Sequence, residues 1–300
     1  MSAAEFLVQQ LVNALSVGSL YALIAVGLSL IFGILRLSNF AHGDMMMIGA
    51  FATLLFQQAG LGFAPALVLG ILVAALAGAV IERVAYRPVR GAPDVTMLLT
   101  SLALTFILEN LGILFFSASP RNFPLPEWVT RPWSLGGGAV TFTNINVLSL
   151  GLTLASLAFL TWLMTRTTLG LGMRAAAEDL GAAQLVGIPV NRVIVLAFVL
   201  ASGFAGLAGV LWGAQSGVVD PLMGFTPLLK AFVAAIIGGL GSLPGAVLGG
   251  YLLGALEVLI VAFSPPEVSP YRDAIVFTLL IGFLLLRPGE MLSRNAEVQM

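Results

Sequence analysis

The sequence contains no cysteine and few charged residues. Only 9% of its 300 residues are charged, against about 25% in a typical soluble domain, so the chain cannot cover a water-facing surface. The absence of cysteine excludes disulfides and thiolate metal sites. A net charge of −1 gives no reason to expect nucleic-acid binding. Apolar residues dominate instead, at 59% of the total with a mean hydropathy of +1.05, and this composition predicts a membrane protein.

Catalytic and targeting signatures are missing as well. The sequence has no His/Cys cluster with metal-ligand spacing, no GxSxG nucleophile motif and no Walker motif. We therefore expect neither enzymatic activity nor a cofactor or metal, and any energy input must come from a partner or an ion gradient. No basic residue precedes Arg36. The N-terminus thus lacks the positive region of a cleaved signal peptide, and we expect its first apolar stretch to remain as a span.

Apolar segments recur along the whole chain and predict an all-α, polytopic membrane protein of about 8–10 transmembrane helices. Two of the segments are shorter than the roughly 20 residues that a span needs, which indicates half-helices or tilted pieces beside a cavity. The segments are Phe6–Leu35, Met45–Phe56, Ala64–Ile81, Val95–Phe116, Ile145–Met164, Val193–Ala214, Leu228–Leu240, Gly245–Phe263 and Arg272–Leu286.

Arginines set the expected orientation. Their clusters at Arg83–Arg90, Arg166–Arg192 and Arg287–Arg294 fall on one side of a nine-span arrangement, and the positive-inside rule makes that side cytoplasmic. We expect a multi-pass protein of the bacterial inner membrane with its C-terminus in the cytoplasm. With nine spans, the N-terminus and the loop Ser117–Asn144 lie outside.

Polar residues interrupt the first apolar run, which resumes directly after them: Arg36, Ser38, Asn39, His42 and Asp44. Ionisable groups at membrane depth are costly and usually face a protein interior or a water-filled path. The pattern predicts a broken helix at the centre of a transport protein. Two roles remain open. In the structural role, Ser38 and Asn39 cap the next helix and Asp44 is favoured by its dipole. In the other role, the cluster lines the substrate path.

A weak internal repeat relates Leu20–Asp44 to Leu196–Asp220, and a short apolar segment follows each copy. The identical pairs are Leu20/Leu196, Ala25/Ala201, Gly27/Gly203, Gly33/Gly209, Leu35/Leu211 and Asp44/Asp220. Since the two copies cross the membrane in opposite directions in the expected topology, we predict an inverted repeat with halves of about 1–164 and 193–290 in a single permease domain, 1–300. The alternative is a shared bias toward Gly, Ala and Leu. Asp220 joins Asp44 as a candidate path residue.

A cluster of glycines and a proline predicts a tight turn or helix break between two apolar segments. Its residues are Gly238, Gly239, Gly241, Pro244 and Gly245.

The loop 165–192 is the longest on the expected cytoplasmic side. It predicts a short amphipathic helix over Arg174–Val186, ended by Gly187. Charged Arg174, Glu178 and Asp179 accompany a small apolar face formed by Leu180, Ala183 and Val186–Gly187. We expect this helix to dock on a partner. The alternative is an interfacial helix on lipid, for which Glu178 and Asp179 are poorly suited near anionic headgroups.

Other charged residues lie within apolar segments. Glu109 is expected to pair with a neighbouring helix or to face a permease partner. Lys230 and Glu257 are candidates for a buried pair, which the sequence alone does not establish.

Four stretches resemble the LivH-type permeases of bacterial branched-chain amino acid ABC importers, and the resemblance extends over nearly the whole chain. They are GILRLSNFAHGD at 33–44, RAAAEDLGAAQLVGIPVNRV at 174–193, LLKAFVAAIIGGLGSLPGAVLGG at 228–250 and YRDAIVFTLLIGFLLLRPGEML at 271–292. Close relatives are assigned to branched-chain amino acids, urea or amides, so the substrate stays open among these.

The resemblance implies a set of partners. These are an M-type permease, two cytoplasmic ATP-binding subunits and a periplasmic substrate-binding protein. It also implies that Arg174–Gly187 is the coupling helix seated in an ATPase groove, and that Arg36–Asp44 lies near the translocation path. From the residues alone, a self-sufficient secondary transporter or channel for a small solute remains the alternative.

Overall fold

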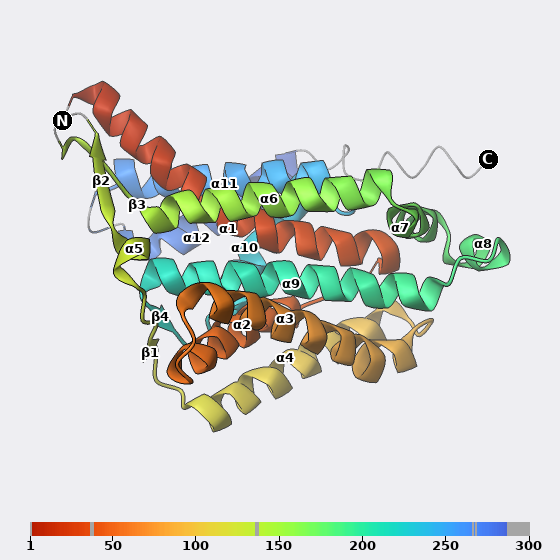
Figure 1. Ribbon diagram of the computed structural model, residues 1–300. Helices are drawn as coiled ribbons and strands as arrows, with labels where there is room; N and C mark the ends of the chain where they lie inside the picture. The colour runs from red at the N-terminus through yellow and green to blue at the C-terminus, as the bar shows by residue number, and fades with distance from the viewer. Residues whose placement is uncertain (1, 37–38, 136–137, 266, 268, 287–300) are drawn as a thin grey trace.

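The computed structural model describes residues 2–36, 39–135, 138–265, 267 and 269–286. Within these ranges the chain is a bundle of long helices with two small two-stranded sheets (Figure 1). The long helices are α1 (Ala3–Leu35), α2 (His42–Gln58), α3 (Phe63–Ile81), α4 (Asp94–Phe116), α6 (Asn144–Arg166), α9 (Val190–Ser216), α10 (Phe225–Gly238), α11 (Leu243–Phe263) and α12 (Arg272–Leu286).

Shorter elements connect these helices. A π-helix, η1 (Glu82–Tyr86), and a 3₁₀ turn, η2 (Arg87–Val89), extend α3, and a second 3₁₀ turn, η4 (Ser269–Tyr271), precedes α12. The remaining short helices are α5 (Glu127–Thr130), α7 (Thr168–Glu178) and α8 (Leu180–Leu185). Strand β1 (Arg121–Asn122) pairs antiparallel with β4 (Val218–Val219), and β2 (Pro132–Leu135) pairs antiparallel with β3 (Val140–Thr143).

The predicted all-α polytopic class is confirmed, because each apolar segment expected from the sequence lies in one of the long helices. In the described part of the chain, six helices are long and apolar enough to cross a membrane: α1, α3 with its extension to Val89, α4, α6, α9 and α11. Helix α2 has 17 residues and α10 has 14. At 1.5 Å per residue, α10 is about 21 Å long, well short of a hydrocarbon core of about 30 Å.

Helices α1 and α9 form the centre of the bundle and run in opposite directions (Figure 1). In their most apolar stretches 83% and 78% of residues are buried, against 17% in both α4 and α6. Helix α1 packs against α10 and α11, while α9 packs against α2 and α3. Glycines at the crossings allow these helices to pack closely. Close packing matters in a membrane, because the surrounding lipid provides no hydrophobic driving force for helix association.

The two ends of the bundle carry different elements. The four strands and α5 lie at one end, together with the start of α1, and α7 and α8 lie at the other (Figure 1). The loops 117–144 and 165–192 are therefore on opposite sides of the bundle, as the expected topology requires.

Helices α2 and α10 begin against each other. A Cβ built on Gly43 would lie 2.7 Å from the carbonyl oxygen of Gly224, so no side chain fits at this crossing. Each half-helix follows one of the two central helices, α1 or α9. This is the arrangement that an inverted repeat would produce, and the repeat remains a proposal.

The expectation of one continuous helix in the loop 165–192 is wrong. The segment Arg174–Val186 is not a single helix, because α7 ends at Glu178 and α8 begins at Leu180. Asp179 between them is extended, with φ −154° and ψ 114°, and its carboxylate accepts a hydrogen bond from the Ala182 amide at 2.9 Å. Aspartate caps a helix better than it continues one, which explains the break. Gly187 has a positive φ of 83° just after α8.

Candidate functional site

The break between α1 and α2 brings polar residues into the centre of the bundle. Helix α1 ends at Leu35, and Arg36 is exposed in a left-handed conformation. Ser38 lies outside the described residues. Asn39, His42 and Asp44 are buried, with 4%, 0% and 3% of their surface exposed. These three form the described part of the predicted cluster, and burial at this depth is consistent with either of the two roles left open for it.

Asn39 does not cap α2, so the capping considered for it under the structural role is wrong. The residue before the helix is Ala41, and no side chain caps the first turn. Instead, the Tyr86 hydroxyl of η1 donates a hydrogen bond to Asn39 Oδ1 at 2.6 Å. The Phe40 amide donates to Ser101 Oγ of α4, also at 2.6 Å. The segment between α1 and α2 is therefore fixed by hydrogen bonds with side chains of η1 and α4, and not by capping from its own side chains.

Tyr86 is positioned by the π-helix in which it lies. Single π-turns occur often at functional sites, because the extra residue re-aims the side chains that follow. Its ring packs against Phe198 of α9 at 5.1 Å between centroids. In the same turn, the fully buried Glu82 carboxylate pairs with Arg90, whose other guanidinium nitrogen donates to Asn191 Oδ1 at 2.6 Å. Asn191 belongs to the first turn of α9, directly after the α7–α8 loop. The π-helix therefore carries both the Tyr86 contact to Asn39 and the Glu82–Arg90 pair that reaches the start of α9.

Helix α4 presents a polar and small face to α2. Ser101, Thr105 and Gly112 are its buried residues. Ser101 contacts Phe40, and a Cβ on Gly112 would lie 2.6 Å from the sulfur of Met47. Because these two contacts bracket the start of α2, the buried Thr105 faces this part of α2, and the half-buried Glu109 lies about one turn further along α4. Sequence reasoning missed Tyr86, Ser101 and Thr105. Ser101, Thr105 and Glu109 are spaced four residues apart on an apolar helix. This spacing places them on one helix face and was the sequence feature that could have indicated a polar face there.

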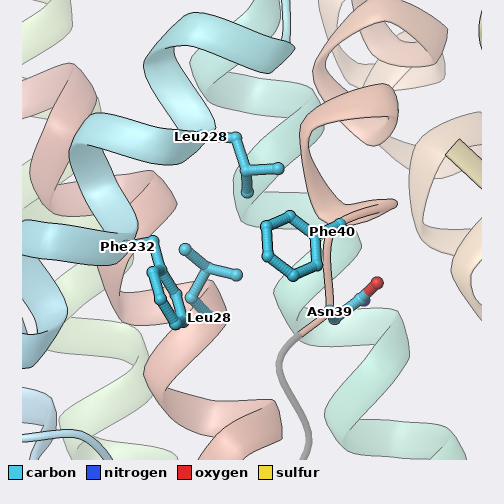
Figure 2. Close-up of a pocket in the computed structure, with 5 residues that line it drawn as sticks. All are labelled: Leu28, Asn39, Phe40, Leu228 and Phe232. Carbon is cyan, nitrogen blue, oxygen red and sulfur yellow. The ribbon is translucent and has the colours of Figure 1, made fainter. Parts of the chain in front are cut away.

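An apolar crevice lies on the opposite side of the break (Figure 2). Leu28 of α1, Phe40 of the break, and Leu228 and Phe232 of α10 converge there, and the Phe40 and Phe232 rings are 6.0 Å apart. Figure 2 shows Phe40 pointing into this group and Asn39 pointing away from it. The crevice is too narrow for a water molecule. The bundle is therefore closed where α1, α10 and the break meet.

The second half of the chain contains a network of charged residues around the buried Lys230 and Glu257, which the more exposed Arg272 and Asp273 join. The Lys230 ammonium donates to Glu257 Oε1 at 3.1 Å and to Asp273 Oδ1 at 2.8 Å. The predicted Lys230–Glu257 pair is thereby confirmed. The Tyr21 hydroxyl donates to the other Glu257 oxygen at 2.6 Å, and Arg272 completes the network at 3.1 Å from Glu257. Two basic and two acidic groups balance each other here, which is how buried charge is tolerated.

Asp220 and the glycine-rich break occupy turns at the two ends of α10. The Asp220 carboxylate accepts a hydrogen bond from the Leu222 amide at 2.9 Å, in the turn between β4 and α10. Gly238 is the last residue of α10, and Gly239 and Gly241 have positive φ of 92° and 86°. The following turn leads into α11, whose first residues include Pro244 and Gly245. The Gly241 amide donates to Ser29 Oγ of α1 at 2.9 Å and so fixes this turn to the central helix.

The structure brings the glycine-rich turn and the predicted coupling segment together. A cavity of about 390 Å³ lies between the end of α1, α7 and the α10–α11 turn. Arg174 and Glu178 line it from α7, and Gly241 and Pro244 line it from the turn. Helix α7 and the end of α1, which line this cavity, lie away from the strands (Figure 1).

The exposed surface of the α7–α8 segment differs from the expected one. Ala183 is buried and Leu180 is half-buried, so the face predicted for docking packs in part against its own chain. Arg174, Glu178, Asp179 and Gly187 are exposed, as a docking surface requires. The most exposed apolar residues are Leu185 and Val186, with 90% and 77% of their surface accessible. Val186 belongs to the apolar face predicted from the sequence, whereas Leu185 does not and was missed.

Comparisons with known proteins agree with this architecture. Residues 10–285 match the family model described as branched-chain amino acid transport system / permease component. The chain is 40% identical to the high-affinity branched-chain amino acid transport system permease protein BraD of Pseudomonas aeruginosa, over 95% of each chain. It is 37% identical to the permease protein LivH of Escherichia coli K12, over 96% of each.

A solved structure shares the fold. A chain of PsaBC from Streptococcus pneumoniae in complex with Fab superposes with a TM-score of 0.51 at 19% identity, covering 95% of this chain and 96% of that one. The fold, the buried break and the extent of the sequence match lead to one conclusion: the chain belongs to the family of branched-chain amino acid transport system permease components.

Proposed function

We propose that this chain is the permease subunit of an ATP-driven importer that moves branched-chain amino acids across the bacterial inner membrane. The observation that carries the proposal is the buried break Asn39–Asp44, which lies between the two central helices. The chain belongs to the family of branched-chain amino acid transport system permease components, and its relatives BraD and LivH are named as permeases of such systems. Urea or an amide is the second substrate class. The chain has no catalytic role of its own in this proposal.

The translocation path runs past the starts of α2 and α10. Half-helices that end inside a membrane are found where backbone groups line a protected cavity, since lipid cannot satisfy them. The crevice closed by Phe40 and Phe232 supports this location, because a transporter at rest must be sealed. The two halves, 1–164 and 193–290, surround the path as an inverted repeat.

The α7–α8 segment is the coupling element in this proposal. Leu185 and Val186 are exposed at the end of a loop with charged neighbours, and an exposed apolar tip of this kind favours a protein groove. The partners are two cytoplasmic ATP-binding subunits, a second, M-type permease subunit and a periplasmic substrate-binding protein. The α7–α8 end of the bundle then faces the cytoplasm, together with the C-terminus.

Co-purification and transport test the proposal together. The chain is expressed with its M-type, ATP-binding and binding-protein partners, purified through a tag on this chain, and reconstituted in liposomes. We expect the ATP-binding subunits to co-purify and leucine uptake to require both ATP and binding protein. Uptake by this chain alone, driven by an ion gradient, would instead establish the secondary transporter, and uptake of urea in place of leucine would change the substrate class.

A further inference from the structure

An apolar groove lies on the side of the bundle between α6 and α11 (Figure 1). Both helices pack against α1, and the space between them has a volume of about 520 Å³. The buried Val26 of α1 lines its base, Leu157 and Leu160 line it from α6, and Val247 and Leu248 line it from α11. Because Leu248 is 64% exposed, the groove opens sideways, toward the surrounding membrane.

The groove belongs to the half of the membrane nearest α7. It extends along α6 from Leu157 to Thr165, the last residue but one of that helix. At 1.5 Å per residue this is about 12 Å, close to half of a hydrocarbon core of about 30 Å. On α11 its lining is confined to the first two turns, from Leu243 to Leu248. A groove of this length and composition fits an acyl chain from a single leaflet.

The groove continues into the cavity of about 390 Å³ beside α7. Met164, Leu243 and Pro244 line both spaces, so the apolar groove leads to the region that Arg174 and Glu178 border. In the described part of the chain, neither of these two charged side chains forms an ion pair. The continuous space therefore has an apolar body and a mouth bordered by charges of opposite sign.

We propose that this groove binds a phosphatidylethanolamine molecule, with an acyl chain between α6 and α11 and its headgroup against α7. The inference goes beyond the proposed function and does not depend on which solute is transported. Arg174 receives the phosphate, because the guanidinium group offers a fork of donors that matches phosphate oxygens. Glu178 receives the ammonium group, which provides three hydrogen-bond donors.

The spacing of the two charges favours this headgroup over others. Arg174 and Glu178 are four residues apart in α7, which places their Cβ atoms about 5–6 Å apart on one helix face. Ethanolamine joins the phosphate to the ammonium group through a short ethylene link, so one headgroup reaches both side chains. The choline cation of phosphatidylcholine has no donor for Glu178. Phosphatidylglycerol has no cation, and its net negative charge would lie beside the Glu178 carboxylate.

Titration of the complete transporter with lipids, followed by native mass spectrometry, tests the headgroup selectivity. The delipidated complex in detergent receives dioleoyl phosphatidylethanolamine, phosphatidylglycerol or phosphatidylcholine. We expect the affinity for phosphatidylethanolamine to exceed that for phosphatidylglycerol at least about tenfold, the effect of one hydrogen bond to a charged group. The factor over phosphatidylcholine should be smaller, since choline keeps the positive charge. Equal affinity for the three lipids would overturn the proposal, because any membrane lipid would then cover this surface.

Two charge variants distinguish the two ends of the headgroup. Arg174→Gln should weaken binding of all three lipids, since each carries a phosphate. Glu178→Gln should weaken binding of phosphatidylethanolamine and leave that of phosphatidylglycerol no weaker, so the preference between them should be lost. Arg192→Gln and Asp94→Asn are the controls, at exposed positions that line neither space. Wild-type selectivity in both site variants would overturn the proposal.

A groove-filling variant distinguishes a lipid from a protein occupant. Thr161 lines the groove from α6 but not its charged mouth, so Thr161→Trp places a bulky ring where the acyl chain would lie. We expect this variant to lose phosphatidylethanolamine binding and to co-purify normally with its partner subunits. Leu154→Trp, at an exposed position of α6 outside the groove, is the control and should keep the lipid.

Two results with the groove-filling pair would overturn the proposal. Loss of the second permease subunit from Thr161→Trp complexes, but not from Leu154→Trp complexes, would assign the groove to a contact between subunits. Undiminished binding of phosphatidylethanolamine by Thr161→Trp would place the lipid elsewhere on the transporter.

Discussion

Gly43 and Gly224 touch through their backbones where α2 and α10 begin. A methyl group at either position would meet the main chain of the other helix, which cannot move aside as a flexible side chain would. The contact therefore fixes the distance between the two half-helices on which the proposed path depends.

Gly43→Ala should destabilise the protein by roughly 1–3 kcal/mol, the usual cost of overpacking a dense core. Thermal unfolding in detergent and leucine uptake measure the effect. Gly151→Ala is the control, since a Cβ at Gly151 of α6 would meet nothing within 4 Å. Equal melting temperatures for the two variants would show that the close approach does not constrain the fold.

Tyr86→Phe removes the hydroxyl that donates to Asn39 Oδ1. An unsatisfied buried acceptor costs about 1–3 kcal/mol, so we expect lower stability and slower uptake. Asn39→Leu should have a similar effect. Because the two residues share one interaction, the double variant should cost less than the sum of the single ones. Additive effects in this double-mutant cycle would mean that the hydrogen bond does not hold the break. Tyr271→Phe, at an exposed tyrosine, is the control.

Lys230→Met should be among the most damaging single changes outside the break. In this variant Arg272 is the cation that still contacts Glu257. Removal of one partner of a buried ion pair costs roughly 3–5 kcal/mol, because the other charge is left without compensation. Yield of folded protein in the membrane and its melting temperature report the loss. Arg166→Met, at the exposed end of α6, should change neither. Normal yield of the Lys230 variant would indicate that this ion network is dispensable.

Orientation can be measured directly because the chain has no cysteine. A cysteine at Ser119, in the loop at the strand end, should react with a membrane-impermeant thiol reagent added to the outside of the cell, once the outer membrane has been made permeable. A cysteine at Ala182 of α8 should react only after the inner membrane is opened. Both positions are exposed, so access depends on the side alone. The opposite pattern of labelling would reverse the topology and remove the basis for docking at α7–α8.

Much of the fold could be predicted from the sequence because apolar runs in a membrane protein map directly onto helices. The segments Leu228–Leu240 and Met45–Phe56 are short in the sequence and form short helices in the structure. Asp179 shows the limit of such reasoning. It lies in a run of good helix formers, and only its capping hydrogen bond to Ala182 reveals that the helix ends there.

The candidate site was only partly predictable. Asn39 and Asp44 are conspicuous because polar residues in an apolar run are rare. Tyr86, which donates to Asn39, and Ser101, which accepts from the Phe40 amide, are ordinary residues on other helices, and nothing in the sequence near the break points to them. The burial of Ala183 and the exposure of Leu185 likewise depend on how α8 packs against α9, which is a tertiary property.

The measurement that tests the central claim most directly is the ATP hydrolysis of the reconstituted transporter when the α7–α8 tip is changed. Leu185→Asp and Val186→Asp place charges on residues that are exposed in the isolated chain, so the permease should still fold and insert. Leu61→Asp, in the turn between α2 and α3, is the control.

We predict that ATP hydrolysis no longer responds to loaded binding protein in the double variant and that leucine uptake falls at least about tenfold, while the control keeps both. Full, binding-protein-dependent uptake by the Leu185→Asp, Val186→Asp variant would contradict the account, because energy would then reach the path without passing through this segment.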